Sequence, residues 1–127
     1  MSSDEERTER GRQLAEKLFA GAQRGTSGPS PKIFRDYTYR HLFGEVWQGT
    51  ELTLQERSIA TCTTLIALNR TAEQHLHFLA AKNLGVPREK IEGIIAHLAH
   101  YAGWPCAASA SSVLNEVWPA STPQPGC

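Results

Sequence analysis

Residues 53–85 have the sequence TLQERSIATCTTLIALNRTAEQHLHFLAAKNLG. Apolar residues recur in this stretch at the spacing of helices rather than in the alternation of strands. The polar link at 69–71 divides the stretch into two segments. Because a link this short is typical of antiparallel neighbours, the sequence predicts a helical hairpin.

Capping residues mark the ends of both predicted helices. Thr53 precedes the first helix and Glu56 follows three residues later, a spacing typical of a capping box. We expect this helix to end at Asn69. Thr71 is the expected cap of the second helix, and Gly85, which readily adopts a left-handed conformation, is expected to end it.

Four further segments have the same helical periodicity. Ser3, with Glu6 three residues later, marks the start of the first of them. The predicted fold is therefore an all-α, six-helix bundle. The further helices are expected at about 4–22, 31–47, 87–102 and 105–118.

The chain length of 127 residues fits one compact unit. We predict an N-terminal helix within 1–24, a helical domain over 25–118 and a flexible tail at 119–127. A turn-rich loop at 25–31 joins the first two parts.

Charge and hydropathy exclude two classes of partner. Thirteen basic and thirteen acidic residues cancel, so the chain lacks the positive field with which proteins collect nucleic acid. No apolar run approaches the roughly 20 residues that cross a bilayer, and the charged start of the chain does not resemble a secretory leader. We expect a cytoplasmic protein that binds neither nucleic acid nor membrane.

The three cysteines are Cys62, Cys106 and Cys127, and none of them forms a Cys-x-x-Cys pair. We expect reduced thiols. Cys62 lies in an apolar stretch where cysteine acts as a small buried hydrophobe. Cys106 follows a proline at a predicted helix start, which can lower a thiol pKa, but it is a lone thiol and catalysis by it is the lesser alternative.

Four stretches, in order, resemble the carboxymuconolactone decarboxylase family: LFGEVW at 42–47, LTLQER at 52–57, Glu-x-x-x-His at 73–77 with a glycine eight residues later, and YAGWP at 101–105. Together they span about 33–118. The resemblance implies an alkylhydroperoxidase-like helical fold, association as a homotrimer or homohexamer, and active sites near subunit contacts. The small chain and the small side chains at 107–112 favour the same assembly.

The family includes decarboxylases that use no cofactor and thiol-dependent peroxidases. The peroxidase relay resembles Glu-x(11)-Cys-x-x-Cys-x-x-x-His, whose positions are Ser58, Arg70, Glu73 and His77 in this chain. Only the histidine is retained. Since the thiolate pair is missing, the resemblance predicts decarboxylation rather than hydroperoxide reduction.

Four residues are the expected catalytic groups. Glu73 and His77 are four apart on one helix, so the carboxylate can orient the imidazole and raise its pKa. His77 would return a proton to the substrate carbon, and Arg57 would hold a carboxylate or oxyanion, unless it merely pairs with Glu56, Glu73 or Glu45. Glu45 is the alternative partner for the histidine, unless it faces solvent.

Three aromatic residues, Tyr101, Trp104 and Trp47, are expected to line the substrate pocket, although packing alone would also explain them. His97 and His100, three apart, could join Glu73 and His77 around zinc or iron. We expect no metal, because histidines at helical spacing are commoner than metal sites.

The predicted function is cofactor-independent decarboxylation of a small cyclic acid such as a carboxylated lactone. Ser58 stands where the family commonly has glutamate, and Gln74 and His75 also depart from the family pattern, so the substrate can differ. One alternative is decarboxylation, dehydration or isomerisation of a polyketide or other natural product. Another is a non-catalytic oligomeric binding protein, which an assay over a substrate panel would distinguish.

Overall fold

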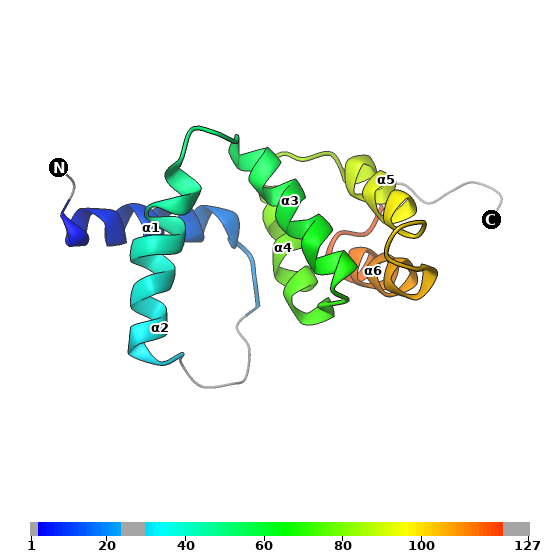
Figure 1. Ribbon diagram of the computed structural model, residues 1–127, viewed down its shortest axis with the longest axis horizontal. Helices are drawn as coiled ribbons and strands as arrows, with labels where there is room; N and C mark the ends of the chain where they lie inside the picture. Colours follow the sequence, from blue (N-terminus) through cyan, green and yellow to red (C-terminus); the bar gives the residue numbers. More distant parts are fainter. Residues whose placement is uncertain (1–2, 24–29, 121–127) are drawn as a thin grey trace.

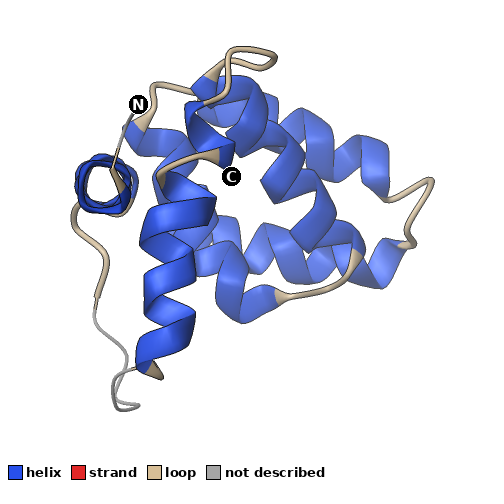
Figure 2. Cartoon of the chain, turned by 60° about the vertical axis from the view of Figure 1, so that its left-hand side comes forward, coloured by secondary structure: helices blue, strands red, loops and turns tan. Residues whose placement is uncertain are grey.

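The structure, a computed structural model, describes residues 3–23 and 30–120. Within these ranges it contains six α-helices and no strand, which confirms the predicted all-α class (Figures 1 and 2). The α-helices are α1 (Asp4–Leu18), α2 (Lys32–Tyr37), α3 (Leu54–Ala67), α4 (Thr71–Asn83), α5 (Arg88–Leu98) and α6 (Trp104–Val117). A π-helix, η1 (Thr38–Phe43), and a 3-10 turn, η2 (Val46–Gln48), follow α2.

Helices α3 and α4 form the predicted hairpin at the centre of the molecule (Figure 1). Thr53 caps α3 with a complete capping box, since the Glu56 amide donates to Thr53 Oγ1 at 3.1 Å and the Thr53 amide donates to Glu56 Oε1 at 2.8 Å. Gly85, with φ +81, follows the end of α4 as expected. The prediction that Thr71 caps α4 was wrong, because Thr71 is already helical and Arg70 takes the cap position.

Two long-range side-chain hydrogen bonds join the helices of the hairpin. The Gln55 amide donates to the Leu84 carbonyl at 2.8 Å, and the Gln74 amide donates to the Leu65 carbonyl at 3.1 Å. The Leu84 carbonyl follows the end of α4, where carbonyls lack partners within the helix, whereas the Leu65 carbonyl also accepts from the Arg70 amide at 2.9 Å.

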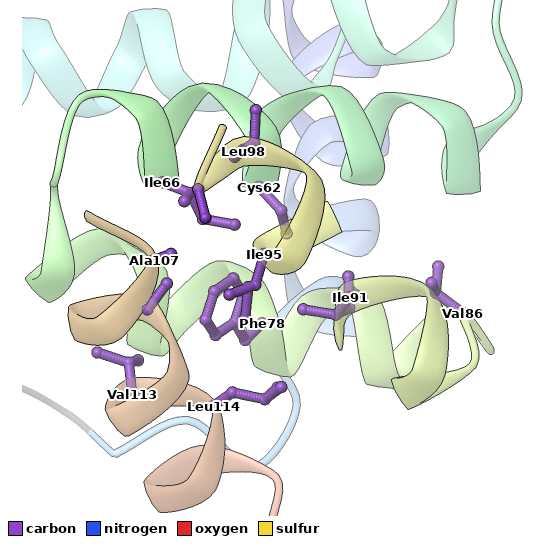
Figure 3. Packing of buried hydrophobic residues seen from close by; sticks show 13 residues of the cluster. Cys62, Ile66, Phe78, Val86, Ile91, Ile95, Leu98, Ala107, Val113 and Leu114 are labelled. Carbon is purple, nitrogen blue, oxygen red and sulfur yellow. The ribbon is translucent and has the colours of Figure 1, made fainter. Parts of the chain in front are cut away.

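The main hydrophobic core lies between α3, α4, α5 and α6. Phe78, Cys62 and Ile66 are fully buried at its centre (Figure 3). The predicted stripe on α5 faces them through Ile91 and Ile95. Two of the small residues of α6, Ala107 and Ala110, pack against this core, while Ala108, Ser111 and Ser112 are exposed on the other side of the helix.

A second core lies between α1, η1, η2 and the other side of α4. Leu14 and Leu18 of α1 pack there with Phe43, Trp47 and Ala80. Helix α4 thus contributes to both cores. The two cores place α1 and α2 at one end of the molecule and α5 and α6 at the other (Figure 1).

The segment predicted as one helix over 31–47 differs most from expectation. It is divided into α2, η1 and η2, because α1 crosses η1 with close backbone contact at Gly11 and Gly44. Helix α2 extends beyond this crossing, so Ile33 and Phe34 of α2 are 66% and 62% exposed. The predicted first helix also ends earlier, at Leu18 rather than near residue 22.

Several expectations fall outside the described residues. These are most of the 25–31 loop, the tail from 121 onward and Cys127. The division into an N-terminal helix, a helical domain and a tail therefore stays a prediction. Within the ranges 3–23 and 30–120, no helix has both the length and the apolar character needed to cross a membrane.

The crossing of α1 and η1 predicts a sharp contrast between two glycine substitutions. A Cβ added at Gly11 would lie 1.8 Å from the Tyr39 carbonyl oxygen, whereas a Cβ at Gly93 of α5 meets nothing within 4 Å. We expect Gly11→Ala to lower the free energy of unfolding by about 3 kcal/mol and the Tm by about 10 °C. Gly93→Ala should raise stability by about 0.5–1 kcal/mol. Thermal unfolding followed by circular dichroism tests this pair, and an equally stable Gly11→Ala protein would contradict the crossing.

Candidate active site

The two helices of the hairpin carry an unusual group of polar side chains, which we call the α3–α4 seam. It consists of Arg57 and Ser58 on α3 and of Gln74 and His77 on α4. Each has a buried polar atom without a hydrogen-bond partner: Arg57 Nε, Ser58 Oγ, Gln74 Oε1 and His77 Nδ1. Buried unpaired polar atoms are uncommon in proteins, and their concentration in one hairpin marks a place where water or a ligand would find partners.

His77 occupies the border between the two cores. Its ring packs edge-on against Phe19 at 5.5 Å between centroids, and Cys62 Sγ donates to its backbone carbonyl at 3.5 Å. Burial lowers the pKa of His77 below the ordinary value, and the nearby Glu73 carboxylate raises it by less. Glu73 thus acts on the His77 pKa in the expected direction, but burial disfavours the charged imidazole more than Glu73 favours it, so the pKa is lowered overall.

Glu73 makes its hydrogen bond with Arg70 rather than with His77. Arg70 Nη2 donates to Glu73 Oε1 at 2.7 Å, and this bond holds the pKa of the Glu73 carboxyl below its usual range. Glu73 is therefore ionised at neutral pH. It acts on His77 through space, as a negative charge one helical turn away.

Arg57 is held at the start of α3 by the loop that precedes it. Its side chain is 11% exposed, and its Nη2 donates to the Gly49 carbonyl at 3.2 Å and lies 3.4 Å from Glu51 Oε2. Its ion-pair partner is thus Glu51 rather than Glu45, Glu56 or Glu73, the three alternative partners expected from the sequence. The Glu51 side chain is 75% exposed, so an incoming anion can displace this weak pairing.

Cys62, next to the seam, is a poor nucleophile. Burial raises the pKa of its thiol to about 12. The Ser58 hydroxyl is close enough to oppose this rise but does not meet the geometry of a hydrogen bond. The expectation that Cys62 is a buried hydrophobe is confirmed.

Glu45 lies beside α1 rather than in the seam. Its carboxylate is 3.4 Å from Arg7 Nη1 and 3.8 Å from His41 Nδ1. Trp47, expected to contact substrate, is 8% exposed and packs against Phe43 in the second core. The positions of both residues support structural roles within one protomer.

The aromatic residues of the YAGWP stretch lie at the corner between α5 and α6. Tyr101 and Trp104 are 77% and 66% exposed. The Tyr101 ring is tilted against His97, and the Trp104 ring packs edge-on against His100. The four residues considered as a metal cluster do not come together. Within 3–23 and 30–120, no group of three or more His, Cys, Asp or Glu side chains is placed to hold a metal ion.

Sequence reasoning did not include Ser58 or Gln74 among the site residues, although both are fully or almost fully buried. Each was noted only as a departure from the family pattern. One physical signal was available. A hydroxyl or an amide on the inward face of a helix costs free energy when it is buried without a hydrogen-bond partner.

The burial of His77 and the nearby charge of Glu73 together predict the outcome of an NMR pH titration. The His77 ring should titrate below the ordinary histidine value, and Glu73→Gln should lower its midpoint further, because the variant removes the charge that favours imidazolium. Glu116→Gln is the matched control: it should lower the midpoint of His75, to which Glu116 is hydrogen-bonded, and leave His77 unchanged. A His77 midpoint above that of a model imidazole would contradict the burial argument.

Two sequence comparisons identify relatives of this chain. A sequence model of the carboxymuconolactone decarboxylase family matches residues 34–116. The 4-carboxymuconolactone decarboxylase of Acinetobacter baylyi is 34% identical over 85 residues, which cover 67% of this chain and 63% of that protein. The chain thus spans less than two thirds of the length of this relative. On these grounds the chain belongs to the carboxymuconolactone decarboxylase family.

Proposed function

We propose that this chain is a decarboxylase that acts on a small cyclic acid, such as a carboxylated lactone, without a bound cofactor. Membership of the family and the similarity to the 4-carboxymuconolactone decarboxylase of Acinetobacter baylyi support the reaction class. The observation that carries the proposal is the half-buried His77, whose Nδ1 has no partner, in the same seam as a guanidinium with an unused Nε. Together these groups offer a positive charge and a proton carrier.

The reaction needs both groups. The bond between the ring carbon and the carboxylate breaks, carbon dioxide leaves, and the electron pair is delocalised into a conjugated carbonyl to give an oxyanion. A proton then joins the carbon, so each turnover consumes one proton. A conjugated carbonyl in the substrate is itself the electron sink, and the protein has to supply charge stabilisation and a proton.

In this proposal Arg57 stabilises the negative charge and His77 delivers the proton. The pKa of His77 is lowered in the free protein, so the resting imidazole is neutral. An anionic substrate beside it would favour the imidazolium, and His77 would take up its proton as the substrate binds. Glu73, ionised and one turn away, adds to this effect.

We further propose that the protein acts as a homotrimer or homohexamer. Within one protomer Tyr101 and Trp104 lie at a corner distant from α1 and α2 (Figure 1). Their exposure, together with the exposed Ile33 and Phe34 of α2, supports contacts with other copies of the chain. In such an assembly the active sites would lie near subunit contacts, as the family resemblance implies.

The substrate can differ from the lactone after which the family is named. Ser58 provides a short hydroxyl at the position where a glutamate is common, and its Oγ lacks a partner. An unpaired donor in the seam suits a substrate with an additional carbonyl or ring oxygen. A panel of carboxylated lactones and cyclic keto acids, including natural-product precursors, is therefore the appropriate assay set.

The test is steady-state decarboxylation, followed as carbon dioxide release over the panel. On the best substrate, we expect His77→Gln to lower kcat by about 100-fold, the usual weight of a positioned general acid, with a smaller change in KM. Arg57→Gln should lower kcat/KM by about 100-fold, the weight of a charge-assisted hydrogen bond. Arg35→Gln, which removes an exposed arginine of α2, is the matched control and should keep wild-type rates.

Light scattering and thermal melts serve as controls for assembly and folding in this series. We expect all variants to have the mass of three or six chains. A 14.0 kDa particle at micromolar concentration would contradict the proposed assembly. A folded His77→Gln protein with undiminished turnover would contradict the proposed mechanism, and the absence of turnover on the whole panel would favour a binding protein.

A further inference from the structure

A separate cavity lies on the side of α4 that faces away from the α3–α4 seam. It has a volume of about 540 Å³ and is formed by α4, α6 and residues 21–23. His75 and His77 are two apart on one helix and point in roughly opposite directions, so the lining residue His75 belongs to this cavity and His77 to the seam. The volume lies within the range of small-molecule sites.

Apolar side chains form much of the wall. Leu76 and Leu79 of α4, Ala72 one turn earlier, and Val117 of α6 line the cavity. Leu76, one of these residues, is a large apolar side chain that is 36% exposed. Such a wall favours a ligand with an apolar body.

The polar part of the wall consists of Gln23 and of an ion pair between His75 and Glu116. His75 Nε2 lies 2.8 Å from Glu116 Oε2, and His75 Nδ1 lies 2.8 Å from the Thr71 carbonyl. Both ring nitrogens therefore face acceptors, an arrangement that requires the imidazolium form. Glu116 Oε1 remains without a protein partner among the described residues and is available as an acceptor.

We propose that this cavity binds a small, neutral, mainly apolar molecule that carries one hydrogen-bond donor, of the size and kind of indole or a phenol. The apolar wall would hold the ring, and Glu116 Oε1 would accept the donor hydrogen. The charges of His75 and Glu116 cancel, so the cavity has no net charge to attract an anion, and the free carboxylate oxygen repels one. The site thus differs in ligand chemistry from the proposed catalytic seam, whose substrate carries a carboxylate.

The test uses the full chain and indole as the probe, with binding followed by two-dimensional amide and histidine-ring NMR. We expect saturable shifts at His75, Leu79 and Val117 at millimolar indole, and no saturable shift there with benzoate at the same concentrations. Ala72→Phe, which fills the cavity from an exposed position, should weaken indole binding by about 10-fold or more. Ala60→Phe makes the same change at an exposed position of α3 and should leave binding unaltered.

Removal of the acceptor gives a second, independent variant. Glu116→Ala should weaken indole binding by about 3-fold to 10-fold and should allow benzoate to bind, because its repulsion is gone. His77→Gln should bind indole as the wild type does, so a failure of the proposed decarboxylase mechanism leaves this result intact.

Four outcomes would overturn the proposal. The first is that no signal shifts saturably up to the solubility limit of indole, and the second is that Ala72→Phe binds indole as tightly as the wild type does. The third is that benzoate or benzylamine binds more tightly than indole. The last is that Ala72→Phe loses oligomer mass. The last would show that another copy of the chain covers this face.

Discussion

The packing of α3 against α4 is the contact on which the rest of the structure depends. Phe78, Cys62 and Ile66 are fully buried between these helices and the α5–α6 pair, while Ala80 on the other side of α4 faces α1. Both cores are therefore built on one hairpin, and Figure 3 shows the packing of the first of them. A capping box at Thr53 and the two glutamine bonds between the helices fix its register.

The candidate site is polar although it belongs to two packed helices. An interface between two helices normally excludes unpaired polar atoms, because each costs about 1–3 kcal/mol when it loses water without gaining a partner. The seam nevertheless contains such atoms on Arg57, Ser58, Gln74 and His77. A site that binds a charged substrate needs donors that are not already satisfied by the protein, and the hairpin provides the rigid framework that keeps them in place.

Local sequence signals predicted the hairpin well. Helical periodicity, the Thr53–Glu56 spacing and Gly85 act over a few residues, so they can be interpreted without the fold. The π-helix η1 could not be predicted in this way, because it accompanies a crossing in which Gly11 and Gly44 bring two backbones together from distant parts of the sequence. The position of His77 on a helix was predictable, but its pKa depends on burial beside Phe19, which is a tertiary property. The partners of Arg57 and Glu73 likewise depend on which side chains the loops bring near.

In the proposed mechanism, Arg57 and His77 form one anion-binding, proton-delivering site. The most direct measurement is an NMR titration of the protein, labelled with ¹⁵N in its arginine and histidine side chains, with a carboxylated lactone that cannot lose carbon dioxide. If the two residues share one site, the Arg57 Nε–H and His77 ring signals shift along one saturation curve. His77 moves toward the imidazolium form, and His75 does not respond. Shifts centred on His75, or a bound lactone that leaves Arg57 and His77 unchanged, would contradict the proposed mechanism.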